Sequence, residues 1–200
     1  MSKTIREPRQ ERSIEKKNKL IQAGYALFSE VGYYNTNTAE IAKRAGVSTG
    51  IVYGYFKDKR DILLSVLEIY IKEVSEPILS ALDNITSPID YQSIIPNLLD
   101  ITTKAHKEHS NIHEALHSMA SSDDEVEKKF RLLEDDLTRD ITAKLVACGV
   151  SCDSLKEKVH LAINMIQSYS HECIYDNHNY IDYKKMRNIV IDTLINLFNH

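Results

Sequence analysis

The sequence predicts an all-α protein, and three observations carry this prediction. Apolar residues recur at spacings of three and four along most of the chain, as in helices with one buried face. The 200 residues include only 6 Gly and 4 Pro. Hardly any segment alternates apolar and polar residues with the period of two that is typical of strands. The expected helices cover residues 13–31, 38–45, 49–56, 59 to about 76, 88–107, 111–120, 124–147, 154–178 and 182–199, and Pro77 should kink or end the fourth.

The first expected helix carries one apolar stripe and is followed by a natural stop. Its apolar positions fall at i, i+3, i+4, i+7, i+8 and i+11, which are Leu20, Ala23, Gly24, Leu27, Phe28 and Val31. Gly32 comes directly after the stripe, and glycine ends helices well because it adopts the left-handed conformation without a Cβ penalty. Residues 1–10 are polar and are expected to form a flexible arm.

Two short helices joined by a glycine-containing turn come next. Asn37 and Glu40 have the spacing of a capping box, with Asn in place of Ser or Thr. Gly46 should end the helix at 38–45, and Ser48 is the expected N-cap of the helix at 49–56. This arrangement is a helix-turn-helix.

The helix at 49–56 has two different faces. Val52 and Phe56 are four residues apart and should face inward. The outward positions are the unusually bare set Thr49, Gly50, Tyr53 and Gly54. Because each glycine costs a helix roughly 1 kcal/mol relative to alanine, such a face indicates a backbone that has to approach a broad partner closely. A helix of this kind fits the major groove of B-DNA, which is about 12 Å wide.

The charge is distributed unevenly along the chain. Residues 1–60 carry 12 Lys and Arg against 6 Asp and Glu, whereas residues 61–200 carry 13 against 23. A basic head on an acidic body favours a polyanionic partner for the head, although a random excursion in charge would give the same pattern.

Composition also excludes several classes of protein. No apolar run approaches the ~18–20 residues of a membrane span, and the amino end has no apolar stretch that could serve as a secretory signal. The three cysteines, Cys148, Cys152 and Cys173, are too few and odd in number for a disulfide scaffold. We therefore expect a protein of the reducing cytoplasm, with no membrane partner.

The stretch from Gly32 to Leu64 carries a dense set of motif residues. They are Gly32-Tyr33, Ile41-Ala42, Ala45-Gly46-Val47-Ser48, Gly50, Val52-Tyr53, Tyr55-Phe56, Lys59 and Leu63. This set resembles the DNA-binding domain of the TetR (tetracycline-repressor-like) family of transcriptional regulators. The resemblance implies a DNA-binding domain over residues 1–60 and a helical effector-binding and dimerisation domain over residues 61–200.

The same resemblance implies which residues contact double-stranded DNA. Thr49, Gly50, Tyr53 and Tyr55 match the recognition-helix positions, Thr38 and Lys59 match phosphate-contacting positions, and the helix caps Asn37 and Ser48 complete the expected interface. Ile51 either touches a thymine methyl or packs at the rim of the helix. Lys43 is either a phosphate contact or an ordinary solvated charge.

Members of this family are generally homodimers, and the last helix offers a stripe suited to that role. The stripe consists of Met186, Ile189, Val190, Thr193, Leu194 and Leu197, although it could also pack inside its own subunit. Two recognition helices on a twofold axis would read a palindromic operator with half-sites roughly 34–36 Å apart, or a multiple of that distance.

The effector domain offers candidate pocket residues and one enzymatic alternative. The candidates for a small-molecule pocket are Tyr70, His113, His117, Phe130, Met165 and Tyr169, each of which could instead be ordinary core. His109, His113 and His117 have helical spacing that could hold a metal in a helical enzyme. No HExxH sequence, glycine-rich phosphate loop or nucleophile elbow occurs, so we expect no enzyme, no metal and no cofactor.

The sequence thus favours a ligand-responsive transcriptional regulator, a repressor that a small-molecule effector releases from its operator. The alternatives are an activator and a DNA-binding regulator without a small-molecule ligand.

Overall fold

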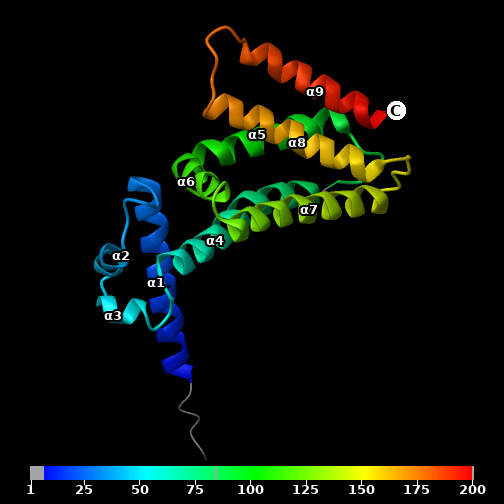
Figure 1. Cartoon of the computed structure of the whole chain (residues 1–200). Helices are drawn as coiled ribbons and strands as arrows, with labels where there is room; N and C mark the ends of the chain where they lie inside the picture. Colours follow the sequence, from blue (N-terminus) through cyan, green and yellow to red (C-terminus); the bar gives the residue numbers. More distant parts are fainter. Residues whose placement is uncertain (1–6, 84, 200) are drawn as a thin grey trace, which may run out of the picture. The chain divides into compact units, whose positions relative to one another are not determined.

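The computed structural model describes residues 7–83 and 85–199 (Figure 1). Within these ranges the chain forms nine helices and no strand, which confirms the all-α prediction. The helices are α1 Glu7–Val31, α2 Thr38–Arg44, α3 Thr49–Val52, α4 Lys59–Asp83, α5 Tyr91–Glu108, α6 Ser110–Ala120, α7 Asp124–Ala147, α8 Leu155–Ile174 and α9 Tyr183–Asn199. No helix of the described chain is long and apolar enough to cross a membrane.

Several expected boundaries differ from the structure. α5 begins at Tyr91 instead of residue 88, and α8 ends at Ile174 instead of residue 178. Residues 7–10, predicted as part of a flexible arm, are helical, and residues 1–6 lie outside the described chain. α3 ends at Val52 instead of Phe56, because the N–H of Gly54 bonds to the carbonyl of Ile51 in a tighter three-residue turn.

A further difference concerns Pro77, which does not end α4. The helix continues through it to Asp83. A proline inside a helix removes one backbone hydrogen bond, but Ile78 and Leu82 beyond it are buried at 8% and 4% exposure. The apolar packing of this last part of α4 offsets the lost bond.

The chain divides into two compact units. The amino-terminal unit comprises residues 1–70 together with 111–126, and the second unit comprises residues 71–110 together with 127–200. The functional division after residue 60 therefore stays a prediction, since the first compact unit extends beyond it and also includes most of α6.

In the amino-terminal unit, α2 packs against α1 and α3, and α1 approaches α4 closely at Gly24. Phe28, Ile41, Val52 and Leu63 are fully buried in this unit. Gly24 of α1 lies so near α4 that an added Cβ would come within 2.7 Å of the Cγ2 atom of Ile62. A larger residue at position 24 would push these helices apart.

The local signals that end α1 and that begin and end α2 are confirmed. Asn37 caps α2 by accepting from the N–H groups of Ala39 and Glu40, and the carboxylate of Glu40 accepts from the N–H of Asn37. Gly32 and Gly46 have φ angles of +80° and +71°, the left-handed region in which glycine has no Cβ penalty.

The second unit is a helical bundle with two apolar clusters. α5 packs along α8, and α9 packs against both (Figure 1). The first apolar cluster lies between these three helices and centres on Leu99, Ile166 and Leu194. The second cluster joins the end of α4 to α7 and α8 through residues such as Leu137 and Val159.

Candidate nucleic-acid interface

The short helix α3 has one buried side and one open side. Val52 is completely buried and Phe56, just beyond the helix, is 3% exposed, as predicted. Thr49 and Gly50 are exposed, and an added Cβ on Gly50 would meet no atom within 4 Å. The buried side fixes the helix to the domain, while the open side leaves its backbone accessible to a partner.

Two tyrosine hydroxyls at the end of α3 are positioned by neighbouring helices. The hydroxyl of Tyr53, whose side chain is 58% exposed, lies 3.1 Å from the hydroxyl of Thr38 at the start of α2. The hydroxyl of Tyr55 lies 3.2 Å from that of Ser13 on α1. Each pair uses one hydrogen bond, and a hydroxyl has further bonding capacity, so both tyrosines can still contact phosphate oxygens.

Lys59 has a structural role that the sequence did not indicate. Its ammonium group donates to the backbone carbonyls of Tyr33 at 2.7 Å and Thr36 at 2.6 Å. It also lies 4.1 Å from the centroid of the Tyr33 ring. Burial lowers the pKa of Lys59. Because two of its three N–H groups hold the α1–α2 loop, the expected phosphate contact is limited to the third.

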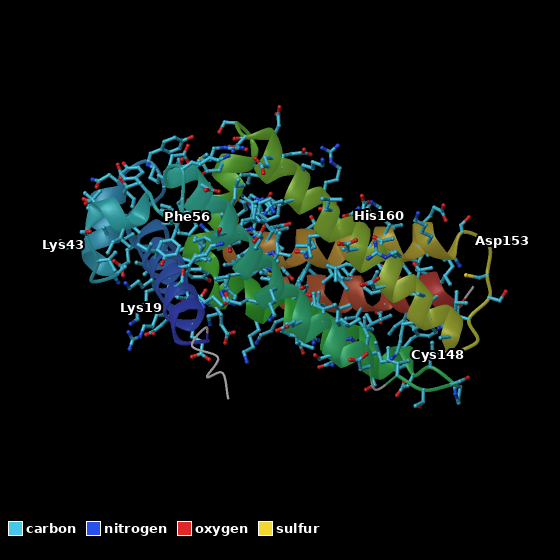
Figure 2. All side chains as sticks on the ribbon, turned by 90° about the horizontal axis from the view of Figure 1, so that it is seen from below. Lys19, Lys43, Phe56, Cys148, Asp153 and His160 are labelled. Atoms are coloured by element: carbon cyan, nitrogen blue, oxygen red, sulfur yellow. The ribbon has the colours of Figure 1, made fainter. Side chains whose placement is uncertain are left out.

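The remaining predicted interface residues lie on or beside α2 and α3. Lys43 is exposed at the outer edge of the amino-terminal unit (Figure 2). Its neighbour Arg44 instead forms a bidentate pair with Glu30, with N–O distances of 2.6 and 2.5 Å. Ser48 is the N-cap of α3 but makes no capping hydrogen bond through its hydroxyl. Ile51 is half-buried, as expected for packing at the rim.

An ionic cluster at the start of α4 was not predicted from the sequence. Arg60 donates to both carboxylate oxygens of Asp123, at 2.5 and 2.8 Å, and to Glu125 at 2.9 Å. Asp123 also caps α7 by accepting from the N–H groups of Glu125 and Val126. The hydrogen bonds from Arg60 lower the pKa of Asp123 to about 2. The break at Ser121–Asp123 signalled a helix start, but no local pattern could reveal a partner 63 residues away.

Comparison with known proteins identifies the amino-terminal region. The family model described as "Bacterial regulatory proteins, tetR family" matches residues 20–66, the range that contains α2, α3 and the start of α4. The chain therefore carries an amino-terminal domain of the tetR family of bacterial regulatory proteins.

Two curated relatives match the chain over its amino-terminal part. The HTH-type transcriptional regulator HbdR of Aromatoleum sp. (strain CIB) is 40% identical over 76 residues, which are 38% of this chain and 33% of HbdR. The HTH-type transcriptional regulator BetI of Serratia proteamaculans (strain 568) is 35% identical over 88 residues, 42% of this chain and 44% of BetI. The chain thus matches less than half the length of either relative.

Solved structures share the fold over nearly the whole chain. A putative TetR-family transcriptional regulator from Mesorhizobium loti MAFF303099 has a TM-score of 0.76 at 18% identity and covers 94% of this chain and 97% of its own. A putative TetR-family regulator from Syntrophomonas wolfei has a TM-score of 0.68 at 21% identity, covering 94% and 96%.

The six predicted pocket residues divide between the two compact units. Tyr70, His113 and His117 lie in the amino-terminal unit, whereas Phe130, Met165 and Tyr169 lie in the second. In the first group, the hydroxyl of Tyr70 lies 2.6 Å from Nδ1 of His113, and the rings of His113 and His117 are 4.0 Å apart. In the second group, the hydroxyl of Tyr169 donates to the carbonyl of Tyr183 at 3.3 Å.

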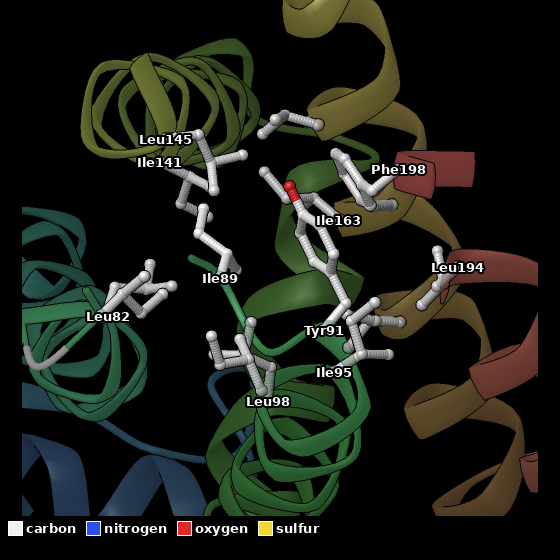
Figure 3. Close-up of a pocket in the computed structure, with 15 residues that line it drawn as sticks. Leu82, Ile89, Tyr91, Ile95, Leu98, Ile141, Leu145, Ile163, Leu194 and Phe198 are labelled. Carbon is white, nitrogen blue, oxygen red and sulfur yellow. The ribbon is translucent and has the colours of Figure 1, made fainter. Parts of the chain in front are cut away.

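The second unit contains an apolar cavity that none of these six residues lines. It has a volume of about 60 Å³, and its walls come from α4, α5, α7, α8 and α9 and from Ile85 and Ile89 between α4 and α5 (Figure 3). Its lining residues, such as Leu98, Ile163 and Leu194, have the helical spacing of ordinary core. Sequence reasoning missed the cavity because a core residue beside a space and one without it have the same pattern.

The predicted dimerisation stripe on α9 is divided by the structure. Val190 and Leu194 are 7% and 0% exposed, and both belong to the core of their own subunit. Met186 and Leu197 are half-buried against the same core. Ile189, 64% exposed, and Thr193 remain outward, so the surface that a partner could cover is narrower than predicted.

The histidines do not assemble into a metal centre within the described chain. No group of three or more His, Cys, Asp or Glu there could hold a metal ion. His109 instead lies 3.5 Å from the carboxylate of Glu73.

Proposed function

We propose that this chain is a DNA-binding transcriptional regulator whose helix-turn-helix reads the major groove. The observation that carries the proposal is the open side of α3. Gly50 has no atom within 4 Å of its Cβ position, while Val52 on the other side is completely buried. A glycine facing open space brings no packing benefit to the folded domain, but it allows the backbone to approach base edges closely.

Two further observations support this function. The exposed Lys43 and Lys57 lie on either side of α3 in the sequence, and cations in such positions neutralise phosphates. HbdR and BetI, which match the amino-terminal part of the chain, are both named HTH-type transcriptional regulators.

We also propose that the protein acts as a homodimer on a palindromic operator. Each of the last two helices carries one large apolar side chain that is more than half exposed, Leu161 at 51% on α8 and Ile189 at 64% on α9. A second copy of the chain would cover them. Two copies would present two recognition helices to half-sites one or more helical turns apart.

We further propose that the protein represses transcription and that a small molecule relieves this repression. The apolar cavity of the second unit supports a ligand-binding role for that unit, because ligand sites are concave and mostly apolar. The protein would have one conformation that binds DNA and one that does not. A ligand that binds the second conformation more tightly would lower the DNA affinity, by at most the difference between its affinities for the two conformations.

The first test is selection of genomic DNA fragments by the purified full chain, with the enriched DNA read by sequencing. Recovery of a palindromic site is expected. No enriched sequence at low salt, in the absence of added ligand, would contradict the proposal.

A substitution at Gly50 tests the interface itself. Gly50→Ala meets no atom of the protein and should leave the thermal stability equal or higher. We expect the affinity for the selected site to fall about tenfold or more, because the added methyl group separates backbone and bases. Ser118→Ala, at an exposed position of α6, is the matched control. Unchanged affinity of Gly50→Ala would remove α3 from the interface.

A further inference from the structure

The cavity of the second unit has almost purely aliphatic walls. Seven of its 15 lining residues are isoleucine and four are leucine, and none carries a charge. Tyr91 supplies the only oxygen among the side chains drawn in Figure 3. Native interiors contain few spaces larger than a water molecule, and an apolar space of this kind favours an apolar occupant.

The Tyr91 side chain gives the cavity one polar point. Its ring is stacked on that of Phe198, with centroids 5.5 Å apart and planes 14° from parallel. In Figure 3 its hydroxyl oxygen lies between Phe198 on one side and Ile141 with Leu145 on the other. No described residue forms a hydrogen bond with this hydroxyl. Burial, with smaller contributions from the thiols of Cys152 and Cys148, raises the pKa of Tyr91, so the hydroxyl remains a neutral donor.

Charged ligands do not suit these walls. A carboxylate or an ammonium group brought among isoleucine and leucine side chains loses its hydration and finds no opposite charge. Such a transfer is strongly unfavourable. An uncharged oxygen that accepts from Tyr91 replaces lost hydration with a hydrogen bond.

We infer that this cavity binds the effector of the proposed regulator, and that the effector is a small, uncharged aliphatic molecule with one oxygen that accepts a hydrogen bond from Tyr91. This inference rests on the ligand response in the proposed function. The cavity of about 60 Å³ holds only a short hydrocarbon segment without rearrangement of its walls. A chain of a few carbons is therefore the preferred size.

The test uses 2-hexanone as the probe and the full chain labelled at isoleucine δ1-methyl groups. Titration should shift the NMR signals of Ile95 and Ile163, which line the cavity, and leave that of Ile41 in the amino-terminal unit unchanged. Hexanoate and hexylammonium, with chains of similar length, should bind at least about tenfold more weakly because of the cost of burying their charge. Equal binding of either ion, or no shift of the cavity methyls, would overturn the inference.

Two variants locate the contact. Tyr91→Phe should weaken 2-hexanone binding about tenfold, as expected for one lost hydrogen bond, and should leave binding of hexane unchanged. Ala162→Leu fills the cavity and should abolish binding of both. Tyr180→Phe, at a position that is 81% exposed, is the matched control. If Ala162→Leu does not fold, Tyr91→Phe decides alone, and an unchanged affinity for 2-hexanone in that variant overturns the assignment of the hydroxyl.

This test is separate from that of the proposed function. A chain whose cavity methyls shift with 2-hexanone but which selects no DNA would overturn DNA-binding regulation and support the cavity as a ligand site. A chain that selects a palindrome but shows no cavity shifts would support the regulator and overturn the inference about the ligand.

Discussion

The hydroxyl groups of Thr38 and Tyr53 lie 3.1 Å apart and join the start of α2 to the end of α3. Both residues belong to the interface that the TetR resemblance implies. Tyr53 is 58% exposed, so without this bond its phenol ring would have several orientations available. The hydrogen bond holds the phenol in one of them, which would reduce the entropy lost in the proposed binding of DNA.

Thr38→Val and Tyr53→Phe should therefore have non-additive effects on DNA affinity. Each single substitution removes the hydrogen bond between the two hydroxyls as well as any contact that the substituted side chain makes with DNA. The double variant should therefore lose about 0.5–1.5 kcal/mol less binding free energy than the sum of the two single losses. The measurement is fluorescence anisotropy with the selected operator fragment, with Tyr180→Phe as control. Effects that add within about 0.3 kcal/mol would show that the pair does not act as a unit.

Lys59→Met should act mainly on stability. The ammonium group that holds the carbonyls of Tyr33 and Thr36 is lost, so the free energy of unfolding should fall by about 1–3 kcal/mol. If the clamp is its main role, the slope of log affinity against log salt should change by well under the ~1 that accompanies a lost phosphate contact. Denaturant titration and DNA binding at several salt concentrations measure the two quantities. A full unit change in slope with unchanged stability would restore the phosphate role.

Asp123→Asn should reduce the sensitivity of the protein to acid. The pKa of Asp123 is lowered from 3.8 to about 2 by Arg60, so the unfolded chain binds this proton more readily than the folded one. The stabilisation is fully present above about pH 4 and is lost as the pH falls toward 2. With Arg60 partly exposed, we expect about 1–2 kcal/mol from this group. Denaturant unfolding from pH 6 to pH 2.5 at fixed protein concentration should show a shallower decline in the variant. Asp153→Asn, at an exposed position, should behave like the unsubstituted chain.

His106 should make the protein less stable in mild acid. Its side chain is buried at 6% exposure, with Nδ1 lying 3.0 Å from the carbonyl of Thr102. Burial lowers the pKa of His106. The unfolded chain therefore gains this proton first, and stability is lost as the pH falls below the ordinary histidine value of about 6.5. Unfolding between pH 8 and pH 5 should show a smaller slope in His106→Gln than in the control His178→Gln. Equal slopes in both variants would contradict this prediction.

Ile189→Glu should weaken the proposed homodimer. Its side chain is 64% exposed in the single chain, so a charge there costs the folded subunit little but would be buried without a partner in an interface. Sedimentation velocity should show a shift toward monomer, and Val146→Glu, at an exposed position of α7, should not. A dimer that tolerates Ile189→Glu would place the interface elsewhere.

Local signals in the sequence predicted a large part of the amino-terminal domain. The capping box of Asn37 and Glu40 and the left-handed Gly32 and Gly46 are set by residues a few positions apart. The buried Val52 follows from helical spacing. The bounds of α7 agree with the prediction at both ends. Such features depend on near neighbours in the chain, which a sequence pattern contains.

Features that join distant segments could not be predicted in this way. The clamp of Lys59 on the α1–α2 loop spans 23 and 26 residues, and the pair of Arg60 and Asp123 spans 63. The helical spacing of α9 showed which residues were apolar, but only packing decided that Val190 and Leu194 face their own core while Ile189 faces outward.

The sequence by itself determined the all-helical class and the helix-turn-helix, because each depends on spacing within one or two helical turns. The residues from Gly32 to Leu64 also carried the resemblance to the TetR family. The tertiary structure decided which cations are already engaged, which apolar residues surround a cavity, and where Tyr91 presents its hydroxyl. These depend on how side chains far apart in the chain fill space together, and a one-dimensional pattern does not contain that information.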